Sequence, residues 1–78
     1  MANLSSMRVG QTAKINMLRG GSRFIGRATA MGFTPATQIT MLQNIGNGPI
    51  LVFLRDTQVA LGRGEAQKID VSMEANDS

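Results

Sequence analysis

The sequence contains no cysteine, histidine, tryptophan or tyrosine. The absence of cysteine excludes disulfide bonds and thiol chemistry, and the absence of histidine excludes imidazole acid–base catalysis and the usual zinc ligands. The remaining metal ligands are five carboxylates without calcium-loop spacing, at Asp56, Glu65, Asp70, Glu74 and Asp77. A hydroxyl nucleophile needs a base, and only Lys14 and Lys68 remain for that role. We therefore expect no enzymatic activity and no bound metal or cofactor.

Long hydrophobic segments are missing as well. The longest apolar run extends from Pro49 to Leu54, which is six residues, whereas a membrane-spanning helix needs about 20. The first residues lack the basic segment and apolar stretch of a secretion signal. These absences predict a cytoplasmic protein without a membrane span.

The composition predicts one small, basic domain. The chain has 78 residues, of which 42% are hydrophobic, and its nine glycines are typical of a fold with several short strands. Because Glu74 and Asp77 lie near the C-terminus, residues 1–72 carry eight positive and three negative side chains, a net charge of +5. Such a balance favours an acidic partner, protein or nucleic acid, although a basic surface also serves solubility.

Five short strands are predicted. Alternation of apolar and polar residues predicts strands at residues 11–18 and 37–45, a run that is apolar on both faces predicts one at 50–55, and short segments bounded by turn residues predict those at 58–61 and 69–71. Met17, Met31 and Met41 fall at predicted inward positions, where unbranched side chains fill a small core. We expect residues 1–72 to form one mostly β domain, a small, partly open barrel of about five strands with one α-helix inserted after the first strand. Residues 73–78 show no apolar pattern and are expected to form a disordered tail.

The helix is predicted to begin after the Gly20-Gly21 pair. Ser22 is the expected N-cap, because its hydroxyl can accept a hydrogen bond from the first turn. At about 100° per residue, Phe24 falls on one face of this helix and Arg23 and Arg27 fall on the other. The helix therefore has a core face and an arginine face.

The segment Met31-Gly32-Phe33-Thr34-Pro35 marks the point at which the helical pattern stops. Gly32 can adopt the positive φ that a helix C-terminus favours. Pro35 fixes its own φ, donates no N–H and pushes Thr34 toward extended geometry. We therefore predict a helix-to-strand corner here.

A set of short motifs occurs in a defined order along nearly the whole chain. They are Leu4-x-x-Met7-x-x-Gly10, Gly20-Gly21, Met31-Gly32-Phe33-x-Pro35, Gly48-Pro49-Ile50, Ala60-Leu61 and Ala66-x-x-Ile69-x-Val71. In this order and spacing the chain resembles the FeoA family, small SH3-like proteins that accompany the bacterial ferrous iron transporter FeoB. One departure is Ala36, where the family pattern usually has glycine after the proline.

The resemblance implies an SH3-like barrel that docks on the cytoplasmic GTPase portion or inner gate of FeoB and affects ferrous iron uptake. The protein would then be cytoplasmic, or peripheral to the inner membrane through the transporter. This partner gives two sets of side chains a role: the arginines Arg19, Arg23 and Arg27, and the apolar residues Leu42, Leu51 and Phe53, which are out of phase with the predicted core. Each set also has an interpretation without a partner. The arginines can lie on a solvated helix face, and the three apolar residues can be covered by other parts of the barrel. Direct nucleotide binding is not expected, because the glycine pair lacks the lysine and spacing of a phosphate-binding loop.

Two other functions are compatible with the sequence. Small basic β-barrels bind single-stranded nucleic acid, but the aromatic residues available for base stacking are only three phenylalanines. Binding of single-stranded RNA at about 50 mM salt would distinguish this hypothesis. The other alternative is a regulatory module related to the SH3-like C-terminal domain of metal-dependent repressors. The chain is too short to add a DNA-binding helix-turn-helix, so a free-standing repressor is not expected.

Overall fold

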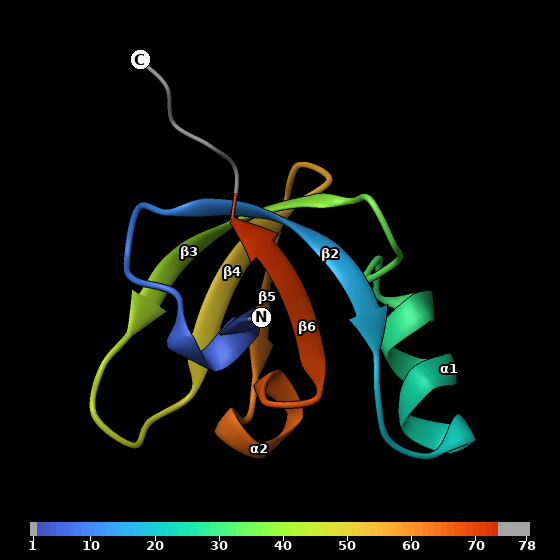
Figure 1. The fold of residues 1–78 in the computed structure, drawn as a ribbon. Helices are drawn as coiled ribbons and strands as arrows, with labels where there is room; N and C mark the ends of the chain where they lie inside the picture. The colour runs from blue at the N-terminus through green and yellow to red at the C-terminus, as the bar shows by residue number, and fades with distance from the viewer. Residues whose placement is uncertain (1, 74–78) are drawn as a thin grey trace.

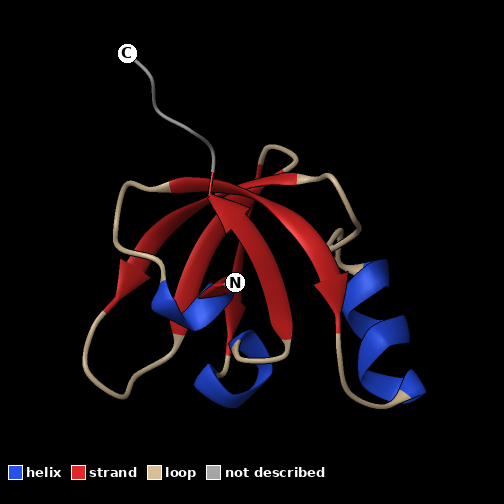
Figure 2. Ribbon diagram, in the orientation of Figure 1, coloured by secondary structure: helices blue, strands red, loops and turns tan. Residues whose placement is uncertain are grey.

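The computed structural model describes residues 2–73, which form a single curled sheet with two helices (Figures 1 and 2). The strands are β1 (Ala2–Asn3), β2 (Thr12–Leu18), β3 (Gln38–Asn44), β4 (Ile50–Leu54), β5 (Thr57–Leu61) and β6 (Ile69–Met73). All neighbouring strands are antiparallel, in the order β1-β6-β2-β3-β4-β5. A 3-10 turn, η1 (Leu4–Ser6), follows β1; α1 (Ser22–Ala30) follows β2, and α2 (Arg63–Ala66) precedes β6. In Figure 1, α1 lies beside β2, and α2 covers one end of the barrel.

This architecture confirms the predicted mostly β, partly open barrel, with two corrections. There are six strands in the described residues instead of about five, because β1 has only two residues and shows no periodicity. It pairs with β6, with Ala2 opposite Val71, so the helix follows the second strand and not the first. Met73 was expected in the tail but is the last residue of β6, opposite Ala13. The rest of the predicted tail, residues 74–78, lies outside the described residues.

The interior of the barrel is apolar. No polar or charged side chain within residues 2–73 is fully buried. The core is made of the inward-facing residues of the strands together with side chains from η1, the helices and the loops: Leu4, Met7, Ala13, Ile15, Phe24, Ala28, Phe33, Ile39, Met41, Ile50, Val52, Leu54, Leu61, Ala66, Ile69 and Val71. Burial of these side chains is the main favourable term in folding a domain of this size.

Two of the three predicted core methionines are not in the core. Met41 is fully buried, but Met17 is 51% exposed and Met31 is 38% exposed. In β2 the pairing shifts after Ile15, so that Asn16 is the extra residue of a β-bulge and Leu18 packs against the core instead of Met17. Met31 is the C-cap of α1, and Phe33 fills the core two residues later.

The predicted corner forms a Schellman motif at the end of α1. The Gly32 N–H donates to the Thr29 carbonyl at 3.0 Å, and the Phe33 N–H donates to the Ala28 carbonyl at 3.0 Å. Gly32 has φ +105°, which side chains with a Cβ rarely adopt. The motif satisfies carbonyls at the helix end and directs Phe33 into the core.

A type II turn then leads from the corner to β3. The Thr37 N–H donates to the Thr34 carbonyl at 3.1 Å, and Pro35 and Ala36 occupy the two central positions. The second central position requires positive φ, and Ala36 has φ +73°. The turn is tied to β2 because the Ala36 N–H donates to the Ile15 carbonyl at 2.8 Å. Glycine adopts this conformation more readily than alanine does.

We expect Ala36→Gly to raise the free energy of unfolding by about 0.5–1 kcal/mol. A left-handed conformation costs an L-residue about 1–2 kcal/mol, and the extra backbone entropy of glycine offsets part of this gain. Urea unfolding followed by far-UV circular dichroism measures the change. The matched control is Ala30→Gly, which replaces an exposed alanine in α1 and should lower stability by up to about 1 kcal/mol. Equal destabilisation by both substitutions would contradict a strained turn.

The start of α1 differs from the prediction by one residue. Gly21, with extended backbone geometry, is the N-cap and provides no side-chain hydrogen bond, whereas Ser22 is the first helical residue. Gly20 precedes it with φ +104°, and a Cβ at this position would lie 3.1 Å from Cδ of Lys68. The glycine pair therefore serves the close turn between β2 and α1.

The loop between β3 and β4 is held by polar side chains at one end of the barrel. This loop contains the predicted Gly48-Pro49 turn, and Gly46 within it has φ +54°. Asn44 Nδ2 donates to the carbonyls of Ser5 and Met7, at 3.1 and 2.7 Å. Arg63 Nη2 donates to Asn44 Oδ1 at 2.8 Å and to the Gly48 carbonyl at 3.2 Å. Asn44 thus joins β3, the N-terminal segment and α2.

Candidate partner-binding surfaces

The first candidate surface is the arginine surface, defined as Arg19, Arg23 and Arg27. Two of its members form ion pairs within the chain. Arg19 Nη2 lies 2.9 Å from Asp70 Oδ1 and also donates to the Gln67 carbonyl at 3.2 Å, and Arg27 pairs with Glu65. Both arginine side chains remain more than half exposed. Their charges are therefore partly neutralised before any partner binds.

Arg23 differs from the other two arginines because it is exposed and has no ion-pair partner within residues 2–73. Lys68 adds a positive charge to the same region, with Nζ 5.1 Å from the centre of the Phe24 ring. The Arg27 guanidinium lies 6.0 Å from the same ring. An acidic protein that approaches α1 would therefore meet Arg23 as the cation without an intramolecular partner.

The second predicted surface, Leu42, Leu51 and Phe53, is only partly continuous. Leu51 and Phe53 are two residues apart on β4 and share its outer face, where Leu51 is half-buried and Phe53 is 39% exposed. Leu42 is the extra residue of a bulge in β3, between the pairs Met41–Val52 and Gln43–Leu51. Phe53 is the chain's one exposed aromatic side chain, because Phe24 and Phe33 are both buried.

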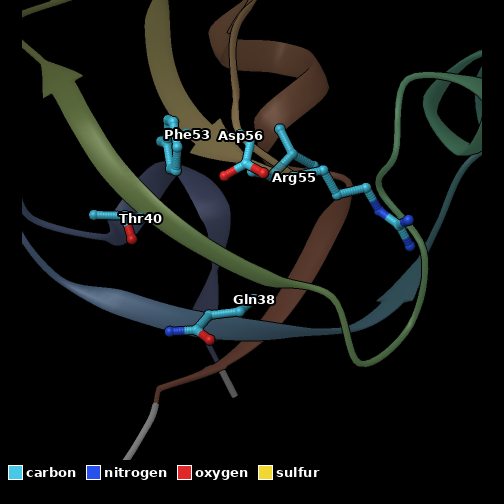
Figure 3. Close-up of a pocket in the computed structure, with 6 residues that line it drawn as sticks. Gln38, Thr40, Phe53, Arg55 and Asp56 are labelled. Atoms are coloured by element: carbon cyan, nitrogen blue, oxygen red, sulfur yellow. The ribbon is translucent and has the colours of Figure 1, made fainter.

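A hollow lies next to Phe53 on the outer face of β3 and β4 (Figure 3). Thr40 is directly opposite Phe53 in the strand register. The hollow has a volume of about 290 Å³ and is lined by Gln38, Thr40, Phe53, Leu54, Arg55 and Asp56. We refer to it as the outer-face hollow.

One wall of this hollow is the tight turn between β4 and β5. Arg55 and Asp56 are its two central residues, with φ +50° and +62°, positions that usually carry asparagine and glycine. Arg55 Nη2 lies 3.3 Å from Thr34 Oγ1 and 3.4 Å from Thr37 Oγ1, so its side chain reaches the corner after α1. The Asp56 carboxylate has no hydrogen bond or ion pair to any residue of the described part.

Sequence reasoning identified Phe53 but missed the residues around it. The sequence marked Asp56 only as one of five scattered carboxylates. A usable signal was present, because a two-residue hairpin turn without glycine or asparagine places two charged side chains at positive φ. Gln38 and Thr40 carried no signal, because only the strand register places them beside Phe53.

Residues 2–73 contain no group of three acidic side chains placed to hold a metal ion. The same segment has no helix long and apolar enough to cross a bilayer.

Comparison with solved structures shows the same fold in several proteins. An iron uptake regulatory protein, FeoA, is 27% identical, with a TM-score of 0.89 and coverage of 94% of this chain and 97% of that protein. Stenotrophomonas maltophilia FeoA, solved with zinc, is 22% identical, with a TM-score of 0.81 and coverage of 92% and 91%. It is described as a prokaryotic SH3 domain protein and a candidate ferrous iron transport activating factor. The SH3-like architecture predicted from the resemblance is thereby confirmed.

The same fold occurs in a longer regulator. A manganese-dependent transcriptional repressor is 21% identical, with a TM-score of 0.85, and the match covers 94% of this chain but only 41% of the repressor. At this identity the likeness concerns the fold alone.

A comparison with curated protein sequences gave no match. The model of the FeoA domain family matches residues 2–73, which is nearly the whole chain. The protein therefore belongs to the FeoA family.

Proposed function

We propose that this protein is a cytoplasmic accessory of ferrous iron uptake that docks on the GTPase portion or inner gate of FeoB and modulates Fe(II) transport. Family membership and the description of a relative as a candidate transport activator support the iron-transport role. The chain's own residues support action by binding and not by catalysis, because the sequence has no histidine or cysteine and residues 2–73 contain no grouped carboxylates of the kind that many catalytic sites use.

The observation that most favours docking through α1 is the position of Arg23. Its guanidinium is exposed and unpaired within residues 2–73, and it lies on the same helix as Arg27. A charge at the rim of an interface contributes mainly to association rate and orientation, and its effect decreases with salt. An acidic surface on FeoB would provide the complementary charge.

We expect Arg23→Glu to weaken binding to the isolated cytosolic domain of FeoB by about three- to tenfold at low salt, since the substitution turns an attraction into a repulsion. The titration is made by calorimetry at two salt concentrations and repeated with the whole transporter in detergent. The difference between variant and wild type should shrink at the higher salt concentration.

The matched control is Arg8→Glu. Arg8 is also exposed, and its segment between η1 and β2 lies on the opposite side of the molecule from α1 (Figure 1). The substitution changes net charge by the same amount, so a nonspecific effect would appear in both variants. Arg27 is less suitable than Arg23 as the test residue, because reversing its charge also brings a carboxylate against Glu65.

Equal affinity of Arg23→Glu and wild type would remove the arginine surface from the proposal. Absence of binding to both the cytosolic domain and the whole transporter would refute the docking itself.

A further inference from the structure

We propose that the outer-face hollow binds a basic side chain, lysine or arginine, of the partner protein, with Asp56 as the counter-ion and Phe53 as the surface for stacking. The identity of the partner rests on the proposed function, whereas the chemistry of the hollow does not. This contact would lie on the sheet, separate from the arginine surface on α1.

The charge of the hollow is the first argument. Of the three carboxylates in residues 2–73, Glu65 and Asp70 are paired with arginines, and Asp56 alone has no ion pair. In Figure 3 the Asp56 carboxylate lies between Phe53 and the start of the Arg55 side chain, whose guanidinium extends away toward the corner after α1. Arg55 also lines the hollow but forms no ion pair with its neighbour, so the Asp56 carboxylate remains available to a ligand.

The other walls of the hollow suit a cation that donates hydrogen bonds. Phe53 is 39% exposed, and an aromatic face attracts an ammonium or guanidinium group. Gln38 and Thr40 also line the hollow, and their amide and hydroxyl oxygens are acceptors, although the Thr40 hydroxyl already lies 3.4 Å from that of Thr12; lysine and arginine side chains only donate. An anionic ligand such as a phosphate would instead be repelled by Asp56.

The size and rigidity of the hollow also favour a single side chain. Its volume of about 290 Å³ is at the lower limit of pockets that hold small molecules. The turn that carries Asp56 is held against the corner through Arg55 and the hydroxyls of Thr34 and Thr37. Because the turn holds the backbone of Asp56, only the side chain of this residue has to be ordered when a cation binds.

The test is an NMR titration of the full chain with N-acetyl-arginine amide, and with N-acetyl-glutamine amide as the neutral probe. We expect saturable shifts at the amides of Gln38, Thr40, Phe53 and Asp56 with the arginine probe only. Asp56→Asn should weaken this binding by about fivefold, the upper range for an exposed ion pair. Asparagine tolerates positive φ, so this variant keeps the turn. Asp70→Asn, a matched loss of a carboxylate outside the hollow, should bind the probe as the wild type does.

Several results would overturn the proposal. One is equal shifts with both probes, and another is equal weakening of probe binding by Asp56→Asn and Asp70→Asn. The third is a change in the amide shifts around the hollow with protein concentration and no probe, which would assign the hollow to a second copy of the chain.

The partner is tested separately, because Asp56→Asn should also weaken binding to the FeoB cytosolic domain by about fivefold. If Arg23→Glu weakens that binding and Asp56→Asn does not, docking stands and the hollow is not part of it. If FeoB does not bind at all, the proposed function is refuted, and the probe titration decides the chemistry of the hollow.

Discussion

Phe33→Ala is expected to lower the free energy of unfolding by about 3–5 kcal/mol, the usual cost of removing a fully buried aromatic side chain. Phe33 is 0% exposed and follows the glycine of the Schellman motif, so it connects the end of α1 to the core. A domain of this length has a total stability of only about 4–12 kcal/mol. The substitution should therefore remove at least about a quarter of the total stability and, at the lower end of this range, nearly all of it.

The measurement is thermal and urea unfolding by far-UV circular dichroism, because the chain has no tryptophan or tyrosine to report by fluorescence. Phe53→Ala is the matched control, since it removes the same side chain from an exposed position on β4. It should cost less than about 1 kcal/mol. If the two substitutions had similar effects, the corner would not be anchored in the core as described.

Asn44→Ala is expected to cost about 2 kcal/mol, because it removes a donor from buried or half-buried carbonyls and an acceptor from Arg63. Asn44 contacts the carbonyls of Ser5 and Met7 and the Arg63 guanidinium, whose Nε is already buried without a hydrogen-bond partner. The same unfolding measurements give the change in stability.

The control for this prediction is Asn47→Ala. Asn47 is exposed in the adjacent loop between β3 and β4 and does not have positive φ, so its replacement should change stability by less than about 0.5 kcal/mol. In the Asn44 variant, amide hydrogen exchange should increase in α2 and η1 before it increases in β2. A uniform increase, or stability equal to that of the Asn47 variant, would show that this polar cluster is dispensable.

The corner after α1 could be predicted from the local sequence. Gly32 and Pro35 were sufficient to place the end of the helix, because positive φ and a missing N–H act within a few residues. The same reasoning failed for Met17, because the bulge at Asn16 depends on the pairing of β2 with β6 and leaves no mark in the local pattern. It also missed β1, whose two residues are a strand only because β6 pairs with them.

The candidate surfaces, too, could be predicted from the sequence only in part. The arginines were recognised from their spacing, but spacing did not reveal that Arg19 pairs with Asp70 and Arg27 with Glu65, more than 35 residues away. These two pairs are what distinguish Arg23, the arginine of this surface that has no ion-pair partner within residues 2–73. Asp56, Phe53 and Thr40 come together through the register of β3 with β4 and the tight turn before β5.

The class of protein is predictable from the sequence alone: a small, mostly β, basic domain without histidine or cysteine, with one amphipathic helix, one glycine–proline corner and the motifs of the FeoA family. These features follow from composition and from backbone preferences that act over a few residues. The tertiary structure is needed to show which cations in residues 2–73 lack an ion-pair partner, which apolar side chains are exposed and where the outer-face hollow lies. Those properties depend on strand register and on contacts between residues far apart in the chain, and local preferences carry no information about either.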